Sequence, residues 1–179
     1  SNFFHPILKS HILWYTVFTL ESAPKWQIPK STATEGFFMW AYHSTFYQIY
    51  PIGFCGAPLS NDAIVTPRIR KVLDWTDYLQ SLGIDAILFN PVFESDTHGY
   101  DTKDFTKLDC RLGANADFSE VCQSLHAHGI KIVLDGVFNH VGRNFWAFED
   151  VRKYKWDSAY KDWFHISFDG NSCYNDGFW

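Results

Sequence analysis

The sequence predicts an α/β fold in which three parallel strands alternate with two helices. Three mostly apolar runs, at 46–50, 84–93 and 130–138, are separated by amphipathic segments at 66–83 and 115–128. This alternation indicates right-handed βαβ units and a parallel sheet. In doubly wound sheets and in (β/α)₈ barrels alike, functional groups collect at the carboxyl ends of the strands.

Turn and cap residues mark the first three elements. Phe46–Tyr50 precedes Pro51, which ends a strand. A helix begins at Thr66–Pro67, because proline fits the first helical position, and Gly83 ends it. Ile84–Phe93 is apolar almost throughout, which is typical of a strand buried on both faces.

The second half of the pattern contains a long irregular stretch. Residues 94–114 show no clear period, and a loop of that length in a compact domain is usually functional. The next helix runs from Asn115, the candidate N-cap, to His128, and Gly129 closes it. Ile130–Phe138 is the third predicted strand.

Composition and motifs exclude several classes of function. The chain carries 15 Lys+Arg against 20 Asp+Glu, a net charge of −5, with no basic cluster, which argues against nucleic acid or an anionic membrane as partner. Gly53–Gly56 matches neither the dinucleotide fingerprint nor the P-loop, which disfavours a nucleotide site.

The cysteines and the apolar runs predict the compartment. The 4 cysteines lack zinc-ligand spacing and are expected to be reduced thiols, as in a cytoplasmic protein. Ile12–Leu20 is too short to span a bilayer. Secretion is the alternative, because Lys9 precedes this run and Ser22–Ala23 follow it.

Three regions are predicted along the chain. Residues 1–38 precede the single Met39 and carry no motif; they are expected either to be foreign to the domain or to form an N-terminal extension that packs its aromatic side chains on it. Residues 39–140 hold the strand and helix pattern. Residues 141–179 are irregular and aromatic, as expected for the start of an inserted subdomain.

Four segments in a fixed order carry a resemblance. They are Phe46-Tyr47-Gln48-Ile49-Tyr50-Pro51, then Leu82-Gly83-Ile84 before Asn90-Pro91-Val92-Phe93, then His98-Gly99-Tyr100-Asp101 with Asp104 and Gly113, and finally Asp135-Gly136-Val137-Phe138-Asn139-His140. In this order the chain from about residue 46 to 179 resembles the N-terminal third of the catalytic domain of the alpha-amylase superfamily, glycoside hydrolase family 13. The resemblance implies the first three βα units of a TIM (β/α)₈ barrel plus the start of a domain inserted after strand three.

The resemblance also implies roles for individual residues. Tyr100 would be the aromatic platform on which a sugar ring stacks, and His140 would donate a hydrogen bond to the same sugar. Asp135 would organise the site by pairing with an arginine on a later strand. Each residue alone also suits loop packing or turn capping, and the order of the motifs favours the functional interpretation.

Three further positions complete the predicted site. Asn139 would tie the insertion to the barrel, in some family members through calcium, which is the only cofactor implied. His98 and Asp101 would brace the loop that carries the tyrosine. The expected partner is an α-glucan or maltooligosaccharide, and the oligomeric state stays open.

The family's catalytic groups are implied to lie on later strands, beyond Trp179. Retaining glycosidases use two carboxyl groups about 5 to 5.5 Å apart, one as nucleophile and one as acid. The resemblance places both of them, and an aspartate that stabilises the transition state, after Trp179, so no Asp or Glu of this chain is assigned to catalysis. It therefore implies an incomplete barrel, a fragment of a retaining hydrolase that is inactive alone.

Other functions remain open at this point. The alternatives are a transglycosylase or α-glucosidase of the same superfamily, or a non-catalytic carbohydrate-binding relative that keeps the barrel without the carboxylates. An unrelated α/β enzyme whose motifs match by chance is the third.

Overall fold

A parallel sheet of three strands forms the centre of the computed structural model, which describes residues 40–168. The strand order is β1 (Phe46–Ile49), β2 (Ala86–Phe89) and β5 (Lys131–Leu134), with β2 in the middle. Ala86 is in register with Phe46 on one side and Lys131 on the other. The parallel α/β architecture predicted from the sequence is therefore confirmed for the described residues.

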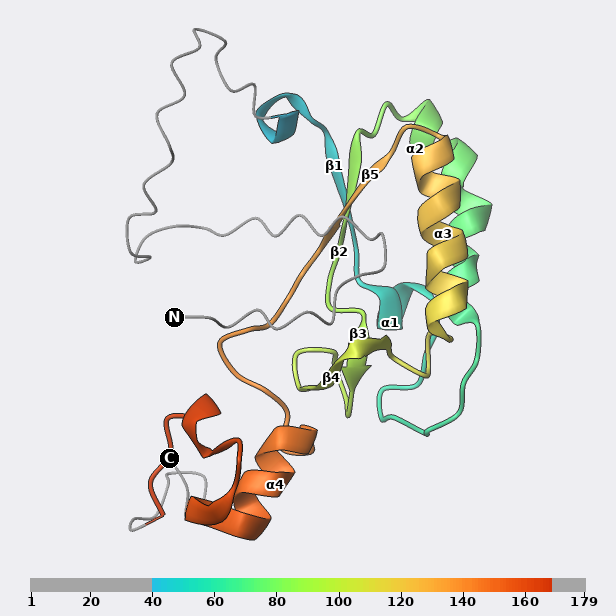
Figure 1. Cartoon of the computed structure of the whole chain (residues 1–179). Coiled ribbons are helices and arrows are strands. Elements are labelled where there is room, and N and C mark those ends of the chain that lie inside the picture. Colours follow the sequence, from blue (N-terminus) through green and yellow to red (C-terminus); the bar gives the residue numbers. More distant parts are fainter. Residues whose placement is uncertain (1–39, 169–179) are drawn as a thin grey trace, which may run out of the picture.

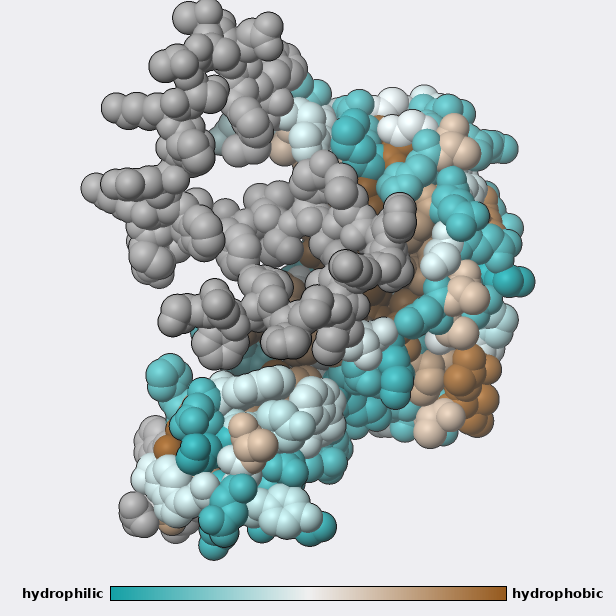
Figure 2. Space-filling view, viewed as in Figure 1, coloured by the Kyte–Doolittle hydropathy of each residue, from teal (hydrophilic) through white to brown (hydrophobic). Residues whose placement is uncertain are grey.

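Helices cover one face of this sheet (Figure 1). They are the 3₁₀ helix η2 (Arg68–Trp75), its continuation α2 (Thr76–Ser81) and α3 (Asn115–Ala127). Their inner faces bury a common apolar core with the strands; it includes Ile69, Val72, Leu79, Val121, Leu125, Ile87 and Phe89. The outer face of the helices is mostly hydrophilic (Figure 2), as expected for helices that pack on one side only.

An antiparallel hairpin follows β2, where the sequence predicted a longer strand and a loop. The strand that was expected over 84–93 ends at Phe89, because Asn90-Pro91 interrupts it and proline cannot donate to a strand ladder. Phe93–Ser95 forms a separate strand, β3, which pairs with β4 (Thr102–Leu108). The predicted loop at 94–114 was wrong in this part, because pairing between strands leaves no simple period in a mixed polar sequence.

Two helix starts differ from the prediction. The helix expected at Thr66–Pro67 begins at Arg68, with Pro67 as the preceding cap residue. Asn115 is not the N-cap of α3; Ala114 is, and the Asp117 carboxylate accepts a hydrogen bond of 2.8 Å from its backbone N–H. The Asn115 side chain instead accepts a 2.8 Å hydrogen bond from the backbone N–H of Leu108, which fastens the helix to the end of β4.

The remaining described elements are short. The 3₁₀ helix η1 (Trp40–His43) precedes β1, and α1 (Pro51–Phe54) follows it. Beyond β5 the chain forms α4 (Trp146–Tyr154), η3 (Lys155–Asp157) and η4 (Lys161–Trp163), below the sheet in Figure 1.

Several predictions concern residues beyond the described range. The predicted region 1–38 lies outside it, as does the stretch from 169 to Trp179. The assignment of 141–179 to an inserted subdomain therefore stays a prediction. The same holds for the placement of the catalytic carboxyl groups after Trp179, which the described residues do not test.

Thiols and membrane segments can be compared with their predictions over residues 40–168. Cys55, Cys110 and Cys122 are free thiols, as expected, whereas Cys173 lies outside the described residues. No helix in this range combines the length and the apolar character that a membrane span requires.

Candidate functional site

Backbone hydrogen bonds between neighbouring strands continue for one residue beyond the ends of β2 and β5. The N–H of Asn90, just after β2, donates to the carbonyl oxygen of Ile49 at 2.9 Å. The N–H of Asp135, just after β5, donates to the carbonyl oxygen of Phe89 at 2.9 Å. The first polar residue after each of these two strands is therefore held in strand register at the same edge of the sheet.

The hydroxyl group of Tyr100 interacts with both of these residues. Asn90 Nδ2 donates to Tyr100 Oη at 2.6 Å. Burial, and after it the negative charge of the nearby Asp135 carboxylate, raises the pKa of Tyr100 above its ordinary value. The phenol therefore stays protonated beside the carboxylate.

Two histidines hold the main chain of Tyr100. His140 Nε2 lies 3.0 Å from the Tyr100 carbonyl oxygen, which can only accept, so Nε2 carries the hydrogen and donates. His98 Nδ1 accepts a 3.2 Å hydrogen bond from the Tyr100 N–H. For His140 to donate to a sugar as well, its ring must release Tyr100 or carry a second proton.

The loop that carries Tyr100 is tied down on both sides. Thr97 Oγ1 donates to Asp101 Oδ2 at 2.7 Å, and Tyr50 Oη donates to the carbonyl oxygen of His98 at 3.2 Å. Gly99 has a φ of +94° and packs on the backbone of Pro91, where a Cβ atom would meet the carbonyl oxygen at 3.2 Å. A residue with a side chain would be strained at this position.

Asp101 keeps one oxygen without a hydrogen bond. Its Oδ1 atom is the buried side-chain polar atom in residues 40–168 that lacks a hydrogen-bond partner, and it lies 3.7 Å from His98 Nδ1. That distance is too long for a hydrogen bond, and His98 Nδ1 already accepts from the Tyr100 N–H. The two residues predicted to brace the loop thus face each other.

Five of the six predicted site residues come together. Tyr100, Asp135, His140, His98 and Asp101 share one network at the strand ends, which we call the strand-end cluster. Asn139, the sixth, is exposed beside it in the chain. The motifs predicted that these residues lie at the carboxyl ends of the strands. The roles of the residues in ligand binding stay predictions.

Two residues that support the strand-end cluster were not predicted from the sequence. Gln48 Nε2 donates to Asn90 Oδ1 at 3.0 Å, so an amide on β1 supports the amide after β2. The available signal was polarity, since Gln48 is the one amide inside an apolar strand and Asn90 follows another. Tyr50, at the end of β1, belongs to the same edge.

A second polar cluster lies under the loop and is buried. We call Ser95, Asp109 and Arg111 the Arg111 anchor; their exposed fractions are 0%, 1% and 0%. Arg111 Nε donates to Asp109 Oδ1 at 2.8 Å and its Nη2 donates to Oδ2 at 2.6 Å, a bidentate pair. Ser95 Oγ donates to Asp109 Oδ2 at 2.9 Å.

The third nitrogen of the guanidinium forms hydrogen bonds with two separate segments of the chain. Arg111 Nη1 donates to the carbonyl oxygens of Pro58, Leu59 and Thr97 at 3.0, 2.8 and 2.7 Å. The loop after β1 and the start of the Tyr100 loop are thereby held against the hairpin. Because its donors are satisfied in this way, the burial of the arginine is tolerated.

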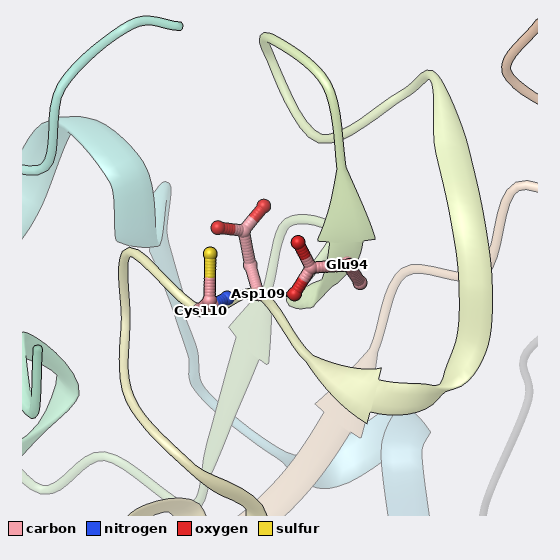
Figure 3. Close-up of side chains that lie close together, drawn as sticks. All are labelled: Glu94, Asp109 and Cys110. Atoms are coloured by element: carbon pink, nitrogen blue, oxygen red, sulfur yellow. Dashed lines mark hydrogen bonds between the residues drawn. The ribbon is translucent and has the colours of Figure 1, made fainter. Parts of the chain in front are cut away.

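Glu94, Asp109 and Cys110 lie close enough to share a metal ion (Figure 3), but each is already engaged. Glu94 accepts hydrogen bonds from Asn61 Nδ2 at 2.7 Å and from the Cys110 N–H at 2.8 Å. Burial and the neighbouring Glu94 raise the pKa of the Cys110 thiol, which donates to Asn61 Oδ1 at 3.2 Å. A protonated thiol and a paired aspartate fit a structural fastening better than a metal centre.

The calcium ion implied for Asn139 stays a prediction. Calcium takes about six to eight oxygen ligands, and amide and backbone oxygens serve as well as carboxylates. Asn139 is exposed, and within residues 40–168 the one group of three His, Cys, Asp or Glu side chains that could share a metal ion is Glu94, Asp109 and Cys110.

Comparisons with known proteins add the family context. The sequence model described as alpha amylase, catalytic domain, matches residues 48–176. A cyclomaltodextrinase from Bacillus sp is 38% identical over 143 residues, 71% of this chain and 26% of the relative. Neopullulanase 2 from Thermoactinomyces vulgaris is 39% identical over 144 residues, with shares of 71% and 25%.

A solved structure shows the same fold. Cyclic alpha-maltosyl-(1→6)-maltose hydrolase from Arthrobacter globiformis, in complex with maltose, superposes with a TM-score of 0.61 at 34% identity. The match covers 75% of this chain and 34% of that one. The chain thus spans about a quarter of the length of the two sequence relatives and a third of this structure.

Proposed function

This chain belongs to the alpha-amylase family, and from that membership we propose that it is part of a retaining glycoside hydrolase acting on α-glucosidic bonds of starch-like or maltodextrin substrates. Its three parallel strands would be the first three of a (β/α)₈ barrel. The observation that carries the proposal is the strand-end cluster, in which Tyr100, Asp135 and His140 meet where such barrels bind their ligands.

The cluster suits a sugar because it combines a fixed ring with polar groups. The apolar C–H face of a pyranose packs on an aromatic ring at small entropic cost when the ring is already held. Tyr100 is held at its hydroxyl, its N–H and its carbonyl oxygen. His140, exposed beside it, would supply a polar contact to the same sugar.

Bond cleavage is assigned to none of the carboxylates in residues 40–168. Asp135 is the acidic residue whose negative charge acts on the hydroxyl of the proposed platform. We assign it to organising the site rather than to attack or proton donation, and place the catalytic carboxyl groups beyond Trp179. The 179-residue chain is accordingly expected to contact maltooligosaccharides without hydrolysing them.

A substitution of the platform tests the proposal. In the protein expressed from its complete gene, Tyr100→Ala should lower kcat/KM on maltotriose and on a cyclomaltodextrin by about 100-fold, because the stacking surface and its hydrogen bonds are lost together. Tyr42→Ala is the matched control, since Tyr42 is 82% exposed in η1. Equal activity of the Tyr100 and Tyr42 variants would contradict the role of the platform.

The same protein distinguishes the candidate reactions. A retaining hydrolase releases products whose anomeric configuration equals that of the substrate, which NMR detects before mutarotation. Accumulation of longer oligosaccharides would instead support a transglycosylase. Binding of maltotriose without any turnover would support a non-catalytic carbohydrate-binding relative, and no binding at all would refute the glucan assignment.

A further inference from the structure

We propose that Asn90 is a positioning residue for the sugar platform: it holds the hydroxyl of Tyr100 and so sets the orientation of that ring above the carboxyl ends of the strands. The inference rests on the proposed function, in which the Tyr100 ring stacks on a sugar. The coupling between Asn90 and Tyr100 can nevertheless be measured without any substrate.

Backbone hydrogen bonds fix the position from which the Asn90 side chain extends. Its N–H is bonded to Ile49 of β1, and the preceding residue, Phe89, accepts from Asp135 after β5. The residue therefore sits at the end of the central strand, between the ends of both neighbours. Few positions of a fold are as well determined as one held on both sides by sheet hydrogen bonds.

Both ends of the Asn90 amide are engaged. Its oxygen accepts from Gln48 Nε2 at 3.0 Å, and its nitrogen donates to Tyr100 Oη at 2.6 Å. Gln48 thus fixes which way the amide faces, because a flipped amide would bring two donors together. The Tyr100 oxygen is consequently approached by a donor from a rigid strand end.

The Asp135 carboxylate acts on the same hydroxyl. Since Tyr100 Oη accepts from Asn90, its own hydrogen stays available to that carboxylate, whose negative charge raises the pKa of the phenol. Two hydrogen bonds run in one direction, from Gln48 to Asn90 and from Asn90 to Tyr100. Hydrogen bonds arranged in one direction polarise and strengthen one another.

A merely structural role for Asn90 gives different expectations. If the amide only tied the loop to the strand, its loss would lower stability and leave Tyr100 unchanged once the protein is folded. If Asn90 acts through the hydroxyl, its loss should have no effect on a protein whose tyrosine hydroxyl is already absent. A double-mutant cycle separates the two.

The cycle combines Asn90→Leu, which keeps the side-chain volume, with Tyr100→Phe, which keeps the ring. In the full-length protein each single variant should lower kcat/KM on maltotriose by about tenfold, the effect of one lost hydrogen bond. The double variant should lose no more than either single one. Asn144→Leu is the control. Asn144 makes a comparable hydrogen bond, 2.8 Å to Asp96, but it is not part of the series Gln48–Asn90–Tyr100.

A measurement without substrate keeps the inference separate from the proposed function. Carbon-13 NMR of the Tyr100 Cζ atom reports the pKa of the phenol, assigned by the signal lost in Tyr100→Phe. Losing the hydrogen bond donated by Asn90 should raise the pKa of Tyr100 in Asn90→Leu, and further in Asn90→Asp, where a negative charge faces the hydroxyl. Asn144→Leu should leave it unchanged.

The outcomes are distinct. Additive losses in the cycle, or an unchanged Tyr100 titration in both Asn90 variants, would overturn the positioning role. A protein that turns over no glucan but shows the shifted titration would overturn the proposed function while supporting the coupling of Asn90 to Tyr100.

Discussion

The two polar clusters of this protein share one hairpin and one loop, yet they differ in burial and in how their donors are used. The Arg111 anchor is buried and directs its donors into the protein: a bidentate pair with Asp109 and three carbonyl oxygens. The strand-end cluster is partly open, with a half-buried Tyr100 and an exposed His140. Polar groups that are fully satisfied stabilise a fold, whereas those that face solvent remain available to a ligand.

The two clusters together allow one loop to be both rigid and functional. The anchor holds the loop from below through the Thr97 carbonyl oxygen, only three residues before Tyr100. The cluster above can then present its groups without having to stabilise the loop itself. Substitutions should therefore separate stability from ligand contact along the same short segment.

The largest effect is expected from Arg111→Met, because it removes the centre of the buried cluster. It leaves Asp109 buried without its cation, and breaking a buried pair by removing one partner costs about 3–5 kcal/mol of unfolding free energy. Lys103→Met is the control in the same hairpin; that side chain is 27% exposed beside Glu94 and Asp96, and its loss should cost under about 1 kcal/mol. Urea unfolding followed by circular dichroism measures both, and equal losses would break the contrast.

An intermediate effect is expected from Gly142→Ala, which tests the packing beside the strand-end cluster. A Cβ atom at this buried position would collide with the backbone of Asp101, and the Gly142 N–H donates to the Thr102 carbonyl oxygen at 2.7 Å. Overpacking of this kind costs about 1–3 kcal/mol. Because His140 lies two residues earlier, its hydrogen bond to Tyr100 should also be lost, which histidine NMR would reveal. Asn144→Ala, on the exposed side of the same turn, should leave that signal in place.

The smallest effect concerns two thiols, Cys55 in the core and Cys122 packed against it. Burial raises the pKa of Cys55 and of Cys122 to about 11, so at pH 8 each carries about 100-fold less thiolate than a free cysteine. Alkylation by iodoacetamide, mapped by peptide mass, should be slower in the folded protein than in urea by about that factor.

The same two thiols predict that the stability of the fold decreases at alkaline pH. Their folded pKa lies above the ordinary value of 9.0, so the unfolded chain loses these protons first as the pH rises. The contribution to stability is complete below pH 9 and declines between pH 9 and about 11. Replacing Cys55 by Ser should remove its part of that decline, and a stability that is flat over this range would contradict the buried state of the thiols.

The sequence predicted the local features and missed those that depend on distant partners. Apolar runs and glycine stops located β1, β2, β5 and both long helical segments, because burial and turn geometry act within a few residues. β4 was missed since Thr102–Leu108 is polar except at Phe105 and Leu108, which gives no alternating pattern, and the segment becomes a strand only through its pairing with β3. Asn115 was expected to cap a helix, but its side-chain oxygen accepts a hydrogen bond from the backbone N–H of Leu108 instead.

The candidate site shows the same division. Tyr100, Asp135 and His140 could be singled out because the family resemblance implies a role for each of them. Gln48 and Asn90 also lie in the segments that carry the resemblance, but no role was implied for them, and their hydrogen bond joins residues 42 positions apart in the sequence. Arg111 was passed over as one charge in an irregular stretch, because nothing in the sequence indicates that its guanidinium is buried.

The partners of Arg111 lie at very different distances along the sequence. Its pairing with Asp109 spans two residues, whereas its hydrogen bonds to Leu59 and Pro58 close loops of 52 and 53 residues. Closing a longer loop costs more chain entropy and slows the formation of the contact. We therefore expect the segment after β1 to join Arg111 late in folding, although it is synthesised well before the arginine.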